Sequence, residues 1–316
     1  MPWTLTSFAP MPAALGFGGS LAMSNSSLSE RFQMKRKFEQ VLKNDFNGAS
    51  IGQVKRAIEN SLGPLPFINW PMDRSWAVMR ARQINESKED ITQQKTFGAP
   101  PDIETSQGRA NLINHPVLYG TFDSRTAMQE IKAPLNSECY VSIWEFRNPP
   151  IVSTFLSGVD QKNDLFGLNK LIPAKLPSGL EGGYTIKSLN YALKLRAQAF
   201  TSSNYEFTSK IAHDVIYNNT AKSVGLLYPS VVDPYRCNIA LNPQYVAREM
   251  ECVRVYKMIW SGAFIFRTLA RGSLVAGSIN WEETGSYELD EIDQKYSGSR
   301  GPNEIHESAL EILKQK

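Results

Sequence analysis

Five residues in the middle of the chain have side chains that could carry chemistry: Arg80, Arg109, Tyr119, Glu130 and Ser230. An arginine presents a planar fork of donors that suits phosphate oxygens, so the two arginines could clamp a phosphorylated ligand. A carboxylate such as that of Glu130 can stabilise a positive charge that develops in a reaction, and an aromatic ring can stack on a planar or cationic group. Taken singly, each residue also has a structural explanation, such as a surface ion pair, a solvated helix face or a turn.

Short motifs surround these residues in a defined order. Arg80 follows the apolar residues 76–79, and this pattern predicts an arginine at the end of a short strand. A Gly-Arg-Ala-Asn segment at residues 108–111 comes next, followed by a Pro-Val-Leu-Tyr segment at 116–119. A helical stretch then ends in Ala-Met-Gln-Glu at 127–130, and a Tyr-Pro-Ser turn at 228–230 precedes the Asn-Ile-Ala-Leu strand at 238–241.

In order and spacing these motifs resemble the RES domain, a family named for its arginine, glutamate and serine, over roughly Trp76–Leu241. The resemblance implies an ADP-ribosyltransferase-like fold that takes NAD as its substrate and uses no metal ion. RES proteins are commonly toxins of bacterial toxin–antitoxin pairs, and they deplete NAD by hydrolysis or by phosphorolysis. The resemblance therefore also implies a cognate antitoxin or immunity protein as a partner. We expect neither a membrane nor a nucleic acid as a direct partner.

The resemblance assigns roles residue by residue. It implies that Glu130, Arg80 and Ser230 are catalytic, and that the residues that bind NAD are Arg80, Arg109, Tyr119, Asn111 and Ser230. Arg82 competes with Arg80 because both lie in one short segment. Ser230 could bond the nicotinamide ribose or hold its own loop, and the sequence does not decide between these roles.

Cleavage of the nicotinamide–ribose bond builds an oxocarbenium-like cation, by analogy with glycoside cleavage, and Glu130 is the glutamate that the resemblance places there. The same chemistry would serve an enzyme that transfers ADP-ribose to a macromolecule. A catalytically inactive module that binds NAD is a second alternative, and a purely structural protein is the least favoured.

Composition narrows these classes further. The chain has 316 residues, of which 42% are hydrophobic, and a net charge of only +3, which by itself does not suggest nucleic-acid binding. No apolar run is long enough to span a membrane. Cys139, Cys237 and Cys252 are odd in number and mostly lie in apolar runs, which predicts reduced core thiols in a cytoplasmic protein. The three histidines are far apart and are interpreted as structural or surface residues.

The pattern along the chain predicts an α+β fold, with a mixed β core, flanking helices and an N-terminal helical extension. Ser27 with Glu30 and Ser50 with Gln53 predict two capped helices, ending near Asn44 and at Gly63. We expect a flexible leader at 1–25, the helical extension at 26–68, a catalytic domain at 69–275 with an irregular insertion at about 149–183, and a polar tail at 276–316.

Overall fold

The computed structural model describes residues 28–63, 67–72, 74, 76–155, 186–218, 222–233, 236–260 and 266–284. The expected leader, most of the expected insertion and most of the expected tail lie outside these residues.

The two predicted N-terminal helices are present as α1 (Leu28–Lys43) and α2 (Ile51–Leu62). The capping box at the start of α2 is confirmed, because the Ser50 side chain accepts a hydrogen bond from the Gln53 amide and the Gln53 side chain accepts one from the Ser50 amide. Gly63 follows the helix with φ 76°, a value that favours glycine. Ser27, the cap predicted for α1, lies outside the described residues.

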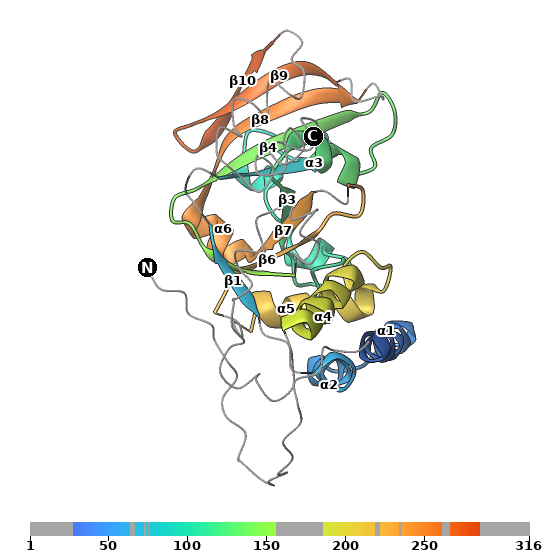
Figure 1. Ribbon diagram of the computed structural model, residues 1–316. Coiled ribbons are helices and arrows are strands. Elements are labelled where there is room, and N and C mark those ends of the chain that lie inside the picture. The colour runs from blue at the N-terminus through green and yellow to red at the C-terminus, as the bar shows by residue number, and fades with distance from the viewer. Residues whose placement is uncertain are drawn as a thin grey trace, which may run out of the picture.

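A ten-stranded sheet forms the centre of the molecule and runs in the order β1-β5-β6-β7-β3-β2-β4-β8-β9-β10 (Figure 1). Neighbouring strands are antiparallel except β5 and β6, which are parallel, so the predicted mixed α+β fold is confirmed. The strands are β1 (Ile68–Pro71), β2 (Ala77–Arg82), β3 (Leu118–Thr121), β4 (Glu138–Phe146), β5 (Ile151–Thr154), β6 (Gly225–Pro229), β7 (Cys237–Leu241), β8 (Met250–Trp260), β9 (Phe266–Val275) and β10 (Ser278–Glu283).

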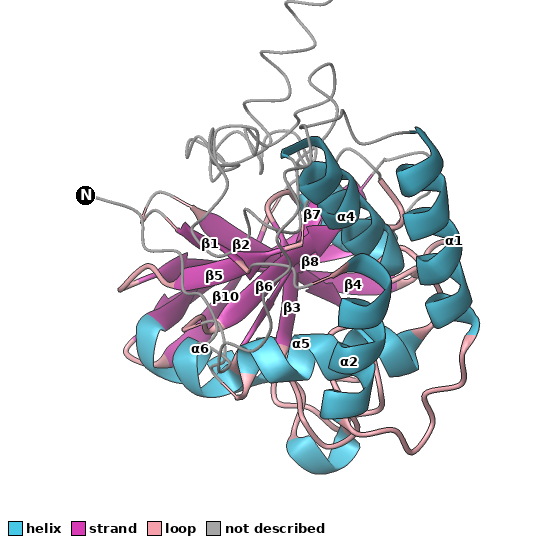
Figure 2. Ribbon diagram, turned by 60° about the horizontal axis from the view of Figure 1, so that its bottom comes forward, coloured by secondary structure: helices cyan, strands magenta, loops and turns pink. Residues whose placement is uncertain are grey.

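Helices cover the sheet unevenly. Helices α4 (Ile186–Ala199) and α5 (Tyr205–Ile216) lie beside β6 and β7, and α1 and α2 pack outside them (Figures 1 and 2). Two short helices, α3 (Ser124–Glu130) and α6 (Pro243–Glu249), follow β3 and β7 directly. Two 3₁₀ turns, Gln94–Phe97 and Asp102–Glu104, lie in the long connection from β2 to β3.

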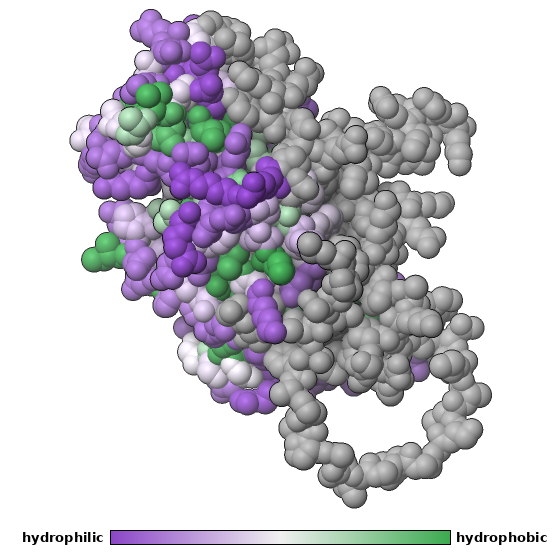
Figure 3. Space-filling model, turned by 90° about the vertical axis from the view of Figure 1, so that its left-hand side faces the viewer, coloured by the Kyte–Doolittle hydropathy of each residue, from purple (hydrophilic) through white to green (hydrophobic). Residues whose placement is uncertain are grey.

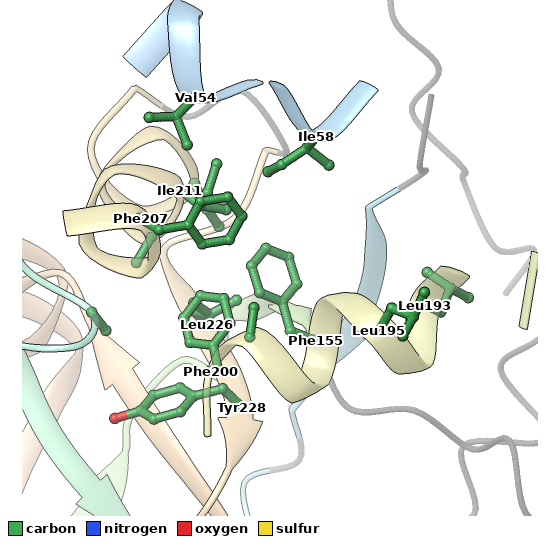
Figure 4. Close-up of a cluster of buried hydrophobic side chains, with 14 of the residues drawn as sticks. Val54, Ile58, Phe155, Leu193, Leu195, Phe200, Phe207, Ile211, Leu226 and Tyr228 are labelled. Atoms are coloured by element: carbon green, nitrogen blue, oxygen red, sulfur yellow. The ribbon is translucent and has the colours of Figure 1, made fainter. Parts of the chain in front are cut away.

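The core between the helices and the sheet is strongly aromatic. Alternation along β6 sends Leu226 and Tyr228 to the helix side and Leu227 to the other side of the sheet. On the helix side, Phe200 packs against the ring of Tyr228 with centroids 5.5 Å apart, and the Tyr228 hydroxyl points away from this cluster (Figure 4). The ring of Tyr228 is therefore part of the core, while its hydroxyl lies outside this cluster of side chains.

Three details differ from the sequence-based expectations. Strand β2 continues to Arg82, so Arg80 lies inside the strand instead of at its end. Asn204 caps α5 by accepting from the Phe207 amide, although Ser203 with Glu206 three residues later fits a capping-box pattern in the sequence. Strands β5 and β10 lie within segments interpreted as insertion and tail; both are short, and β10 is mostly polar, so neither has a strong apolar alternation.

The state of the cysteines and the hydropathy of the surface agree with what the composition predicts. Cys139, Cys237 and Cys252 are free and buried, as predicted, and burial raises the pKa of each thiol. No helix in the described part of the chain is long and apolar enough to cross a membrane. Where the face in Figure 3 is coloured, it is largely hydrophilic, with separate hydrophobic patches.

Strand β3 is packed so closely on β2 that a side chain at Gly120 does not fit. A Cβ there would lie 2.3 Å from Cγ1 of Val78 and 3.0 Å from the carbonyl oxygen of Met79. We expect Gly120→Ala to lower the free energy of unfolding by about 1–3 kcal/mol, measured by urea denaturation. Gly52→Ala in α2 is the control, because its new Cβ would be 3.9 Å from the nearest atom; an equal loss in both variants would contradict the packing argument.

Candidate functional site

A cavity of about 520 Å³ opens between β2, β3 and α3. Its lining combines one carboxylate with several cationic and aromatic side chains of the described residues: Glu130 faces a space that is also lined by Arg80, Arg82, Gln83, Arg109, Tyr119, Thr121, Tyr205, Tyr228 and Asn238. The polar lining and the excess of arginine suit an anionic ligand with several hydrogen-bonding groups.

Glu130 is held at one end of the cavity by two donors. It is the last residue of α3, whose first turn is capped by Asp123 through the Thr126 amide. Its Oε1 accepts a hydrogen bond from Ser230 Oγ and another from Asn238 Nδ2, both at 2.7 Å. One carboxylate oxygen is thus fixed by Ser230, which directly follows β6, and by Asn238 of β7, and this orients the second oxygen.

Ser230 lies behind Glu130. It is 1% exposed and is not part of the lining. Its hydroxyl donates to Glu130 and also accepts from the amides of Val232 and Asp233, at 3.3 and 3.2 Å. These bonds occupy the hydroxyl in holding the carboxylate and the turn, which favours the loop-holding role over direct contact with a ligand.

Arg80 places a positive charge in the middle of the sheet. Its Nη1 donates to the Tyr119 carbonyl oxygen at 3.1 Å, and its buried Nε has no hydrogen-bond partner among the described residues. Burial and the neighbouring charge of Arg82 lower the pKa of Arg80 to about 10, so the guanidinium remains charged at neutral pH. No carboxylate in the described ranges forms an ion pair with it. A ligand anion would supply that missing charge.

Arg82 also lines the cavity, but its guanidinium is already engaged. Nη2 forms an ion pair with Glu89 at 2.7 Å, and Nη1 donates to the Thr96 carbonyl oxygen. The sequence does not decide between Arg80 and Arg82. In the structure, Arg80 is the one whose guanidinium still has an unused hydrogen-bond donor.

Tyr119 connects the two arginine segments. Its hydroxyl donates to Asn111 Oδ1 at 2.8 Å and accepts from the Ala110 amide at 2.7 Å. Burial raises the pKa of Tyr119, so the phenol remains protonated and keeps this geometry. Gly108 makes the approach possible, because a Cβ there would lie 2.4 Å from Asn111 Oδ1 and 2.7 Å from the Tyr119 hydroxyl.

Asn111 itself is 3% exposed and does not line the cavity. Its Nδ2 donates to the carbonyl oxygens of Ser106 and Leu112, at 2.8 and 2.9 Å. With its Oδ1 taken by Tyr119, all of its amide groups are used inside the loop. This arrangement suits a role in shaping the loop rather than the contact with NAD that the resemblance implies.

Arg109 directly precedes Ala110, whose amide donates to the Tyr119 hydroxyl, whereas Arg80 contacts the Tyr119 carbonyl oxygen. Its Nη1 donates to the Phe200 carbonyl oxygen at 2.7 Å, and its Nη2 lies 3.4 Å from the Tyr205 hydroxyl. Its guanidinium carbon is 5.2 Å from the centre of the Tyr205 ring. The turn between α4 and α5 thus orients the second arginine toward the cavity.

The lining residues that the sequence did not single out include Asn238, Tyr228 and Tyr205. Tyr228 belongs to the Tyr-Pro-Ser motif and Asn238 begins the Asn-Ile-Ala-Leu motif, so their places in these motifs could have indicated a role. Tyr205 had no such signal, since it is the first residue of an ordinary amphipathic helix. Burial raises the pKa of Tyr228, and Tyr119 and Glu130 raise it further, so its hydroxyl remains neutral.

Two of the three histidines, although far apart in the sequence, lie together in the structure. The rings of His115 and His213 are 4.6 Å apart, and His213 stacks on Tyr217. None of the three residues lines the cavity, so this cluster is separate from the site.

The fold and the cavity together define an α+β protein whose polar pocket holds one oriented carboxylate and a half-buried arginine that forms no ion pair with any described residue. The family model of the RES domain matches residues 78–261, more than half of the chain, and the chain belongs to this family. The match includes all the candidate residues, from Arg80 to Ser230. No curated protein matches the chain.

The unpaired charge of Arg80 leads to a prediction about stability. Arg80→Met should raise the free energy of unfolding of the ligand-free protein by about 1 kcal/mol, because it removes a desolvated charge that no carboxylate compensates. Arg82→Met is the matched control and should lower stability, because it leaves Glu89 without its partner at 2.7 Å. Denaturation in urea measures both. A loss of stability in Arg80→Met as large as that in Arg82→Met would show that the charge of Arg80 is compensated.

Proposed function

We propose that the protein binds NAD in this cavity and cleaves the bond between nicotinamide and ribose. The observation that carries the proposal is the presence, in one cavity, of a carboxylate oriented by two donors and a half-buried arginine without a counter-charge among the described residues. The diphosphate of NAD carries two negative charges, and an Arg80–Arg109 clamp would neutralise them.

Glu130 has the chemistry that the cleavage step needs. As the nicotinamide leaves, the ribose acquires oxocarbenium-like positive charge, which a fixed carboxylate stabilises without having to reorient. The bonding electrons go to the nicotinamide nitrogen, and the ribose carbon is then attacked by water or by phosphate. Ser230 and Asn238 act through Glu130, by holding one of its oxygens, and are positioning residues in this mechanism.

Glu130→Gln tests the carboxylate. The Gln oxygen can still accept from Ser230 and Asn238, so the fold and NAD affinity should be retained, while turnover should fall on the order of 10²–10³-fold because the negative charge is lost. Nicotinamide release measures turnover, and calorimetry measures NAD binding. A variant with full activity would refute the role of Glu130.

Product analysis of the wild-type protein separates the reaction classes. Incubation with NAD, with and without phosphate, should give nicotinamide together with ADP-ribose for hydrolysis, or a phosphorylated ADP-ribose for phosphorolysis, identified by mass. Label from NAD that remains on a macromolecule would instead mean a transferase. If the protein binds NAD but releases no nicotinamide, it is an inactive NAD-binding module.

The biological role follows from the same proposal. An enzyme that consumes NAD harms the cell that makes it, so the proposed role is that of a toxin whose partner, an antitoxin or immunity protein, blocks the cavity. Expression of the wild-type chain without a partner should lower cellular NAD and arrest growth, and expression of Glu130→Gln to the same level should not. Equal growth arrest by both chains would argue against toxicity through NAD cleavage.

A further inference from the structure

The cavity has a wall that the mechanism above does not use. Tyr205, the first residue of α5, lines it with a ring that is 41% exposed. Large aromatic side chains are usually buried to a greater degree, and an exposed ring inside a polar cavity offers a surface for a planar group. Arg109 lies beside this ring, with Nη2 3.4 Å from the hydroxyl and the guanidinium carbon 5.2 Å from the ring centre, and Tyr205 nevertheless remains 41% exposed.

The register of the sheet shows where Tyr205 stands relative to Glu130. Thr121 of β3 pairs with Asn238, which bonds Glu130, so this end of β3 is the carboxylate end. Tyr119 is two residues away on the same face of the strand, or about 7 Å further along it. Its carbonyl oxygen accepts from Arg80.

From Tyr119 the contacts continue away from Glu130. The Tyr119 hydroxyl accepts from the Ala110 amide, and the adjacent Arg109 contacts Tyr205. Followed along these contacts, the lining residues succeed one another as Glu130, Arg80, Tyr119, Arg109 and the exposed Tyr205.

We infer that Tyr205 stacks on the adenine ring of the dinucleotide. The inference rests on the proposed function, which places the nicotinamide ribose at Glu130 and the diphosphate between the arginines. The group beyond Arg109 is then the adenosine half, and a base stacks on an aromatic face whatever its hydrogen-bonding edge. Arg109 contributes twice, since its guanidinium contacts both the diphosphate and the hydroxyl end of the same ring.

The test measures ligand affinity by calorimetry, so that it does not depend on turnover. Tyr205→Ala should weaken ADP-ribose and AMP about 10-fold, the usual effect of removing a stacking ring. Tyr205→Phe keeps the ring and should bind both ligands within about 2-fold of the wild-type protein. Nicotinamide mononucleotide, which has no adenine, should bind Tyr205→Ala as well as it binds the wild-type protein.

Two controls separate stacking from a structural effect. Inorganic pyrophosphate has no base; if Tyr205→Ala weakened it as much as ADP-ribose, the ring would act only by holding Arg109, and the inference would be wrong. Phe32→Ala removes an exposed ring on α1, 67% exposed and outside the cavity, and should change no affinity.

Failure of the inference and failure of the proposed function are distinguishable. Wild-type protein that releases nicotinamide, combined with unchanged ADP-ribose affinity in Tyr205→Ala, overturns the adenine site alone. If the wild-type protein releases no nicotinamide, but Tyr205→Ala selectively weakens the binding of ADP-ribose, the adenine site is supported and the cleavage reaction is overturned.

Discussion

The arrangement of the site depends on Tyr119 more than on any other side chain. Its carbonyl oxygen accepts from Arg80 on β2, and its hydroxyl accepts from the Ala110 amide and donates to Asn111 in the loop that carries Arg109. One residue of β3 thereby sets the separation of the two arginines. The glycine at position 108 is part of the same constraint, since any side chain there would collide with the hydroxyl. The phenol must remain neutral to serve both partners, and its burial ensures that it does.

The charges in the cavity are arranged for a ligand and not for the stability of the empty protein. Three arginines and one carboxylate of the described residues line it, and only Arg82 has its charge compensated by a nearby glutamate. Arg80 sits in the sheet with a lowered pKa and an unpartnered Nε, a state that costs free energy. Binding sites commonly carry such strain, because groups that were satisfied within the protein would have to be released before they could bind a ligand. Glu130, by contrast, is fully engaged on one oxygen, which suits a group that must hold its orientation while charge develops beside it.

Much of this arrangement could be predicted from the sequence, and the reasons for the exceptions are physical. The capping box of α2 and strand β7 were predicted correctly because their signals are local: a serine three residues before a glutamine, and a short run that is apolar except for Asn238. The order of the motifs identified the family and brought Glu130 and Ser230 together although 100 residues separate them. Strand β10 was missed because its residues are mostly polar, and Tyr205 because nothing in an amphipathic helix indicates that its first residue faces a cavity. The distinction between residues that line the cavity and residues that stand behind it, such as Asn111 and Ser230, depends on side-chain packing that a motif does not encode.

The N-terminal helices are connected to the site through α5. Lys55 of α2 forms an ion pair with Asp214 at 2.9 Å, Lys210 donates to the Phe46 carbonyl oxygen at 3.0 Å, and Asn204, the cap of α5, donates to the Leu42 carbonyl oxygen at 2.8 Å. Each of these contacts fixes α5, and its first residue forms the far wall of the cavity. The aromatic core beneath connects the same helices to the sheet, since Phe207 of α5 packs on Phe38 and Phe46, while Phe200 packs on Tyr228, whose hydroxyl end reaches the cavity. The helices that precede the family match are therefore part of the framework that holds Tyr205 and Arg109 in place, and not an appendage to it.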